Sequence, residues 1–346
     1  MYKSLATKYR PKEFSEVVEQ GVTVRILQRV LEKGAPKNAY LFAGASGSGK
    51  TTLARIFANK LNNGCGTPIE IDAASSAGLV DQVRDLITDA EQRSLDSVYK
   101  VYIIDECHSV SSHGWQAFLK CLEEPPMYTI FMFCTTEPHK IPATVFNRLQ
   151  RYNISKISNE GIRSRLEYIC QQEGFTNYSE TCDLISKTCQ GCMRDAITML
   201  EQCAELSENL CLENSKQILG SVSAEVMMKL TNFLLDGNEE KMFAVIESLA
   251  QEGVDLKQFM SNYLEFILDL CKYIIFQTIG VTNIPEYLES VQDQYTNLRY
   301  TVGFENSLVW FNKLADKVLD INNAIKYDTS SKTTIEAYLI RICRGI

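Results

Sequence analysis

The chain has 346 residues, 45% of them hydrophobic and 23% charged, enough for about two to three domains that each bury a core. This composition excludes a disordered, fibrous or small disulfide-stapled protein. Lys and Arg number 35 against 43 Asp and Glu, so the net charge of −8 gives no global signal for nucleic acid or an anionic membrane. The most apolar late stretch, residues 266–276, is interrupted by Asp269 and Lys272, and the first residues lack an apolar run of signal-peptide length. We therefore expect a cytoplasmic protein with no membrane partner.

Apolar runs in the first half of the chain predict short strands, several of them buried on both faces of a sheet. They cover residues 39–43, 69–72, 100–104, 128–134 and 150–154. Helical apolar stripes lie between them, at positions 53–61, 79–90 and 115–122. Alternating strands and helices predict a parallel sheet with helices on both faces.

Strand signals fade after about residue 157, and amphipathic helices follow. Ser158 is placed to cap one helix, a second pattern follows Ser179, and a third carries Met193, Ile197 and Leu200. Further helices are predicted at 227–235, 241–249, 256–276, 304–327 and 333–344. We expect three domains, covering residues 1–157, 158–220 and 221–346.

Twelve cysteines are spread from Cys65 to Cys343, and Cys189 and Cys192 form a Cys-x-x-Cys pair. A disulfide framework does not suit a cytosolic chain of this kind. Zinc takes about four ligands, and no second pair stands at a finger-like distance, although Cys182 and Cys203 are nearby in sequence. The pattern favours small buried thiols over a metal site.

The stretch after the first predicted strand matches the phosphate-binding pattern G-x-x-x-x-G-K-[ST] and opens a predicted helix. Its residues are Gly44, Ala45, Ser46, Gly47, Ser48, Gly49, Lys50 and Thr51, and Thr52 completes the predicted nucleotide-binding set. Such glycines let backbone N–H groups point at phosphate oxygens. We expect Lys50 to reach the β- and γ-phosphates of ATP and Thr51 to bind Mg²⁺. The alternative is a flexible Gly/Ser turn. It would not explain why Lys50 and Thr51 follow the glycines, or why a strand precedes them and a helix follows.

A second motif is the apolar strand at 101–104, which ends in two carboxylates, Asp105 and Glu106. This is the Walker B position, in which Asp105 would hold Mg²⁺ and Glu106 would deprotonate the attacking water. An acidic pair alone is also typical of a helix start. The letters from Asp105 to His108 resemble the DExH box of helicases, but a helicase needs a second sheet domain, and the C-terminal half reads as helices. We interpret His108 as a loop residue near the site.

Longer stretches add to these motifs. They are Lys8-Tyr-Arg-Pro-Lys12, Glu70-Ile-Asp-Ala-Ala-Ser75, Leu119-Lys-Cys-Leu-Glu-Glu-Pro-Pro126, Thr135-Thr-Glu-Pro-His-Lys-Ile-Pro142 and Gly191-Cys-Met-Arg-Asp-Ala196. Over about residues 5–205 the sequence resembles the ATPase subunits of DNA sliding-clamp loaders, most closely the bacterial DNA polymerase III gamma/tau type and next the small subunits of replication factor C. The resemblance implies an AAA+ domain with a five-stranded parallel sheet, a small helical lid and an all-α collar domain.

The resemblance also implies roles for single residues. Thr136 matches the sensor-1 position near the γ-phosphate, and Arg194 matches the sensor-2 arginine of the lid. Arg148 matches the catalytic arginine that reaches into a neighbouring subunit's ATP site, although Asn147 and Leu149 replace the flanking Ser and Cys of the family's triplet. A solvated helix charge is the alternative for each arginine.

Two further groups of residues take their roles from the resemblance. Tyr9, Arg10 and Pro11 match a segment that lies near the adenine and ribose. Ser75, Ser76 and Arg84 fall in the region that tracks the DNA template backbone, where the sequence has one residue more than the family spacing. A solvated helix face explains Arg84 equally well.

As a whole, the resemblance implies a pentameric ring with other loader subunits. This ring would use ATP binding to open a sliding clamp and ATP hydrolysis to release it on primer-template DNA, with no polymerase activity. Only residues 62–68 stand where bacterial relatives carry a four-cysteine zinc module, and the chain ends without a tau extension. These departures suggest a minimal subunit, from a bacteriophage or a divergent bacterium. The alternatives are another DNA-directed motor, such as a Holliday-junction branch-migration ATPase, and a non-catalytic structural subunit of a loader.

Overall fold

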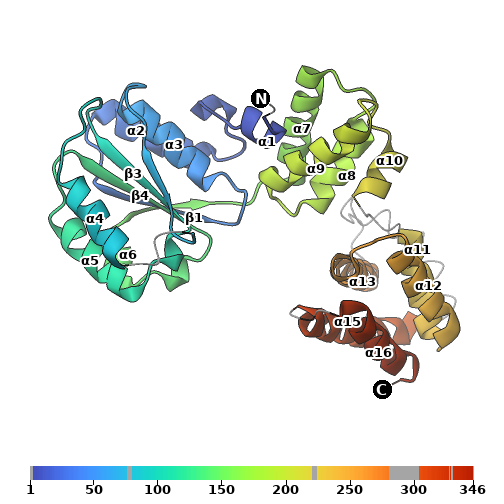
Figure 1. Cartoon of the computed structure of the whole chain (residues 1–346). Coiled ribbons are helices and arrows are strands. Elements are labelled where there is room, and N and C mark those ends of the chain that lie inside the picture. Colours follow the sequence, from blue (N-terminus) through green and yellow to red (C-terminus); the bar gives the residue numbers. More distant parts are fainter. Residues whose placement is uncertain are drawn as a thin grey trace. The chain divides into compact units, whose positions relative to one another are not determined.

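The computed structural model describes residues 3–75, 80–219, 224–279, 304–326, 328 and 330–345. The chain divides into two compact units, Met1–Ser215 and Lys216–Ile346. Figure 1 shows a sheet flanked by helices and a group of lid helices in the first unit, and helices in the second. Three predicted positions lie outside the described residues. They are Ser76 of the predicted DNA-contacting set, the first residue of the helix predicted at 79–90 and the last residue of the helix predicted at 304–327.

Within the described residues, five strands form one parallel sheet in the order β2-β3-β4-β1-β5. Their bounds are β1 Ala39–Gly44, β2 Ile69–Asp72, β3 Lys100–Asp105, β4 Thr129–Thr135 and β5 Gln150–Ile154. The register pairs Ala43 with Thr135 and Asp72 with Asp105, so the carboxyl ends of β1 to β4 meet at one edge. This confirms the predicted five-stranded parallel sheet, and it brings the phosphate-binding loop and the acidic pair to the same edge.

Strand side chains alternate between two buried faces, which explains the unbroken apolar runs of the sequence. Leu41 and Phe133 belong to the core that β-strands share with α4, α5 and α6. Tyr40 and Phe42 belong to the core on the opposite face, shared with α2 and α3. The helices are α2 Gly21–Lys33, α3 Lys50–Leu61, α4 Val80–Ala90, α5 Ser112–Glu123 and α6 Ala143–Phe146. The result is a three-layer α/β/α arrangement (Figure 1).

The lid consists of α7 Asn159–Glu173, α8 Ser179–Thr188 and α9 Met193–Leu206, and α10 Leu212–Ile218 follows. Ser158 caps α7 as predicted, since its hydroxyl accepts a hydrogen bond from the N–H of Gly161 at 3.0 Å. The helix ends at Gly174, whose φ of +79° suits the left-handed conformation of a helix C-terminus. A short helix near the N-terminus, α1 Leu5–Lys8, packs against α9. The sequence did not predict α1.

All regular secondary structure among the described residues of the second unit is helical, which confirms the predicted all-α C-terminal domain. Its helices are α11 Ala224–Leu235, α12 Glu239–Gln251, α13 Leu256–Ile279, α15 Phe304–Ile325 and α16 Ser331–Cys343. Phe259, Ile267 and Phe311 lie in its core. The buried hydroxyls of Thr231 and Tyr263 satisfy each other at 2.8 Å. Among the described helices, none combines the length and the apolar character that a membrane crossing requires.

Candidate nucleotide-binding site

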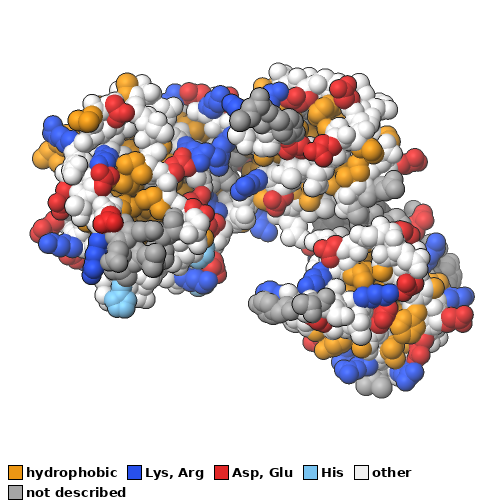
Figure 2. Space-filling model, viewed as in Figure 1, with side chains coloured by type: hydrophobic (Ala, Val, Ile, Leu, Met, Phe, Trp, Pro, Cys, Tyr) orange, Lys and Arg blue, Asp and Glu red, His pale blue; other side chains and the backbone are white. Residues whose placement is uncertain are grey.

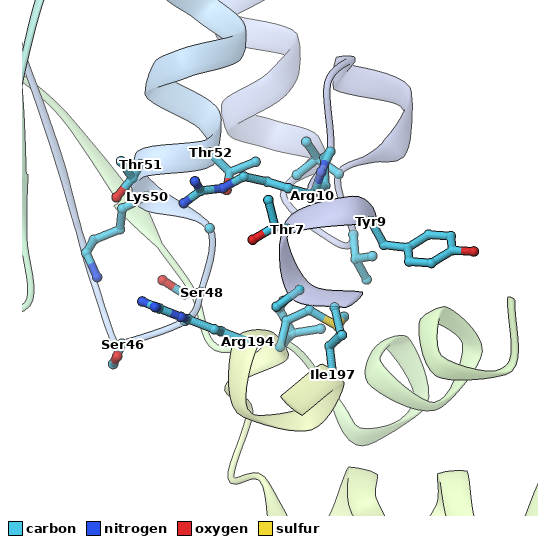
Figure 3. Close-up of a pocket in the computed structure, with 18 of the residues that line it drawn as sticks. Thr7, Tyr9, Arg10, Ser46, Ser48, Lys50, Thr51, Thr52, Arg194 and Ile197 are labelled. Carbon is cyan, nitrogen blue, oxygen red and sulfur yellow. The ribbon is translucent and has the colours of Figure 1, made fainter. Parts of the chain in front are cut away.

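A cavity of about 510 Å³ lies between the carboxyl edge of the sheet and the lid. Its size is within the range of roughly 300–1,000 Å³ typical of ligand sites. Its walls come from the N-terminal segment, the phosphate-binding loop, the start of α3, the acidic pair and the lid. Figure 3 labels residues of all these parts except the acidic pair. The predicted residues that line it are Tyr9, Arg10, Pro11, Ser46, Gly47, Ser48, Gly49, Lys50, Thr51, Thr52, Asp105, Glu106 and Arg194.

The three glycines of the phosphate-binding loop meet two requirements, a close approach of neighbouring atoms and a positive φ. A Cβ at Gly44 would lie 2.2 Å from the backbone oxygen of Ile154, so β5 approaches too closely for a side chain. Gly47 has a φ of +64°, and a Cβ there would lie 2.0 Å from Sγ of Cys192 in the lid. Gly49 has a φ of +101° directly before α3. The loop therefore depends on the positive φ and the close approach that glycine allows.

The lysine and the threonine of the loop lie at the start of α3. Lys50 is only 5% exposed, and its Nζ donates to the backbone oxygen of Ala45 at 2.9 Å. The Thr51 hydroxyl donates to Oδ2 of Asp105 at 2.8 Å. A hydroxyl and a carboxylate oxygen at this spacing are the donor set that Mg²⁺ prefers when phosphates supply further ligands, so the residues fit the metal.

Glu106 adopts a left-handed conformation with a φ of +44°, which turns its side chain out of the strand direction. The Thr136 hydroxyl donates to Oε2 of Glu106 at 3.2 Å. Nδ1 of His108 lies 3.2 Å from the same oxygen. Three predicted residues, Gly44, Ala45 and Thr136, do not line the cavity. Thr136 reaches it through Glu106, the backbone oxygen of Ala45 accepts from Lys50, and Gly44 pairs with Ile154 of β5.

Arginines approach the loop from several elements. Arg10 and Arg194 extend toward it from the N-terminal segment and from the lid (Figure 3). Nε of Arg10 donates to the Thr52 hydroxyl at 3.2 Å. Burial, followed by the nearby charge of Arg55 and that of Arg194, lowers the pKa of Arg10. Because these cations repel one another, the cavity favours an anion.

The N-terminal segment connects the cavity to the lid. The Tyr9 side chain points away from the loop (Figure 3) and donates to the carboxylate of Glu173 on α7. Burial and this carboxylate raise the pKa of Tyr9 to about 12. Arg165 donates to the backbone oxygen of Tyr9 at 2.9 Å, and Glu201 accepts from the N–H of Leu5 at 2.9 Å. The segment is therefore hydrogen-bonded to both α7 and α9.

Other predicted residues lie away from the cavity. Arg148 pairs with Glu123 on α5 and also donates to the backbone oxygen of Thr144. Arg84 is exposed on α4, and Ser75 is exposed on the turn after β2, where its hydroxyl donates to the backbone oxygen of Asp72 at 3.2 Å. Ser76 cannot be placed because it lies outside the described residues.

Several residues that line the cavity were not indicated by any motif in the sequence. They are Ser4, Ala6, Thr7, Val17, Val18, Arg55, Ile157, Arg165, Met193, Ile197 and Thr198. Arg55 follows Thr51 by one helical turn, a spacing that could have indicated it. Arg165 gave no such signal, because the contact that brings it to Tyr9 spans 156 residues. Figure 2 shows Lys and Arg side chains where the sheet domain meets the lid.

Comparison with known proteins gives a consistent pattern along the chain. Residues 69–158 match the family described as DNA polymerase III, delta subunit. Residues 161–209 match the clamp loader subunit ATPase lid domain of DNA polymerase III. Residues 210–344 match domain III of the DNA polymerase III subunits gamma and tau.

Two curated relatives show the extent of the similarity. The chain is 34% identical over 294 residues to DNA polymerase III subunit tau of Bacillus subtilis, a match that covers 79% of this chain and 52% of that protein. It is 32% identical over 288 residues to the gamma subunit of Buchnera aphidicola, covering 77% of this chain and 79% of that protein. The chain thus spans about half the length of the tau relative and most of the gamma relative.

Among solved structures, RuvB of Thermotoga maritima, a Holliday junction branch migration motor, matches with a TM-score of 0.52 and 16% sequence identity. The match covers 65% of this chain and 79% of that chain. At this identity the likeness shows a common fold alone, and it agrees with the AAA+ fold that the sequence predicted.

Proposed function

The chain belongs to the family of DNA polymerase III gamma and tau subunits, and on that premise we propose that it is an ATPase subunit of a sliding-clamp loader. ATP binding would open the clamp, and ATP hydrolysis would release it closed on primer-template DNA. One observation carries the proposal. The loop, the acidic pair and the lid arginine enclose a single cavity of nucleotide size.

Each residue of the cavity has a role in this function. Lys50 and the loop N–H groups would hold the β- and γ-phosphates, while Arg194 would connect the lid to them. Thr51 and Asp105 would hold Mg²⁺, which neutralises phosphate charge when it is bound. Glu106 would accept a proton from the attacking water, and Thr136 would hold its carboxylate in place.

Arg148 would act on the ATP of a neighbouring subunit in the ring. Its side chain is 37% exposed and lies outside the cavity of its own chain, which supports a role in trans. The partners would be the clamp, primer-template DNA and further loader subunits in a pentamer. Ser75 and Arg84 are exposed, as contact with a DNA backbone requires.

The alternative function that the sequence left open is branch migration at a Holliday junction. The test is ATP hydrolysis by the full chain together with its cognate loader subunits. The rate is measured alone, with the clamp, with clamp and primed DNA, and with a four-way junction. We expect clamp and primed DNA together to stimulate hydrolysis most. Stimulation by the junction alone would support branch migration and contradict the proposal.

A further inference from the structure

His108 lies on the turn after β3, and its ring is held between two carboxylates. Nδ1 lies 3.2 Å from Oε2 of Glu106, and Nε2 lies 3.3 Å from Oε2 of Glu137. Nδ1 is also 3.1 Å from the hydroxyl of Thr135, at the end of β4. The His108 side chain is 16% exposed, so the ring is mostly enclosed by these partners. The turn that follows the acidic pair is thereby connected to the end of β4, directly before Thr136.

The contacts assign a donor to the nitrogen that faces Glu106. An ionised carboxylate only accepts hydrogen bonds, so a favourable contact with Glu106 requires a proton on Nδ1, and the contact with Glu137 requires one on Nε2 in the same way. The backbone N–H of Glu137 donates to the Thr135 hydroxyl at 3.0 Å, which fixes the position of that hydroxyl beside the ring. The ring therefore has a defined orientation, with Nδ1 aimed at Glu106.

Two side chains approach the same carboxylate oxygen of Glu106. Thr136 and His108 each reach Oε2, at 3.2 Å. Among the described side chains no donor contacts Oε1, which leaves that oxygen able to accept a proton from water. A half-buried glutamate in a left-handed turn would otherwise sample several rotamers, so two neighbours on one oxygen restrict its direction.

We propose that His108 is a positioning residue for Glu106: its Nδ1–H holds Oε2 and so directs Oε1 at the attacking water. The inference rests on the proposed function, in which Glu106 is the general base. His108 does not line the cavity itself, and it acts through Glu106. Glu137 and Thr135 in turn hold the ring.

The test compares three substitutions, because Asn and Gln reproduce different ring nitrogens. The amide nitrogen of His108→Asn can take the place of Nδ1, whereas that of His108→Gln takes the place of Nε2. ATP affinity and single-turnover hydrolysis are measured in the full chain with its loader subunits. We expect hydrolysis to fall by about 10- to 100-fold in His108→Ala and His108→Gln, with ATP affinity unchanged. His108→Asn is expected to restore most of the rate.

A double variant separates positioning from a general effect on the fold. If His108 acts only through Glu106, adding His108→Ala to Glu106→Gln produces no further loss of rate. Equal rates in the Asn and Gln variants, wild-type rates in all three, or a matching loss of ATP affinity would overturn the proposal. Wild-type hydrolysis by Glu106→Gln would instead show that Glu106 is not the base, a failure of the proposed function itself.

Discussion

Single residues of the phosphate-binding loop are restricted by backbone geometry as much as by phosphate chemistry. Gly44 has no room for a Cβ because the backbone of β5 lies against it, and Gly47 lies against Cys192 of the lid. The motif predicted phosphate binding from Gly44, Gly49, Lys50 and Thr51. It could not predict the contact of Gly44 with Ile154, because that contact joins strands whose pairing is set by the whole sheet.

Gly44→Ala is therefore expected to lower the free energy of unfolding by about 1–3 kcal/mol, since the new Cβ would collide with the Ile154 oxygen. The measurement is urea unfolding followed by circular dichroism. Gly21→Ala is the matched control, because nothing lies within 4 Å of a Cβ at that position in α2. The control should be neutral or slightly stabilising. Equal effects of the two substitutions would contradict the contact.

The roles of Lys50 and Glu106 can be separated by binding and turnover. Lys50→Ala removes a buried ammonium from the loop, so we expect tight ATP binding to be lost. Glu106→Gln keeps the shape of the side chain but removes the base, so binding should persist while hydrolysis falls by at least about 100-fold. Titration calorimetry and phosphate release measure the two quantities. Loss of binding in both variants would refute the role given to Glu106.

At the scale of elements, apolar runs predicted the strands and helical stripes predicted the lid because both signals are local. The N-terminal segment gave no comparable signal. Its helix α1 has four residues, and its partners Glu173 and Glu201 are more than 160 residues away in sequence. Long-range hydrogen bonds of this kind leave no periodicity in the sequence.

Because the Tyr9 hydroxyl donates to Glu173 on α7, we expect Tyr9 to couple ATP binding to the lid. Tyr9→Phe removes the hydroxyl that donates to Glu173 while keeping the ring against Tyr168. We expect ATP affinity to fall by about 3- to 10-fold, which corresponds to one hydrogen bond of roughly 1 kcal/mol. Tyr178→Phe, at the N-terminus of α8, is a control outside the cavity. Equal affinity in both variants, measured by titration with a fluorescent nucleotide, would show that the contact does not reach the site.

At the scale of the whole molecule, the proposed ring requires ATP sites that two subunits share. If Arg148 acts in trans, Arg148→Ala subunits and Glu106→Gln subunits fail for different reasons. Mixing them should restore part of the hydrolysis, because some interfaces then combine an intact Glu106 with an intact Arg148. Glu123→Gln is a useful companion, since it releases Arg148 from its ion pair without removing the guanidinium. If no mixture of verified oligomers exceeds the additive rate, the shared site is refuted.

The measurement that tests the central claim most directly is the number of clamps retained on primed circular DNA. The full chain, its cognate loader subunits and the clamp are incubated with the DNA, and retained clamps are counted after gel filtration. We predict that ATP yields closed clamps on primed circles, that Lys50→Ala yields none above background, and that Glu106→Gln retains clamps only while the loader stays bound. Clamps that accumulate equally without ATP, or equally with Lys50→Ala, would contradict the claim that this chain is the ATPase of a clamp loader.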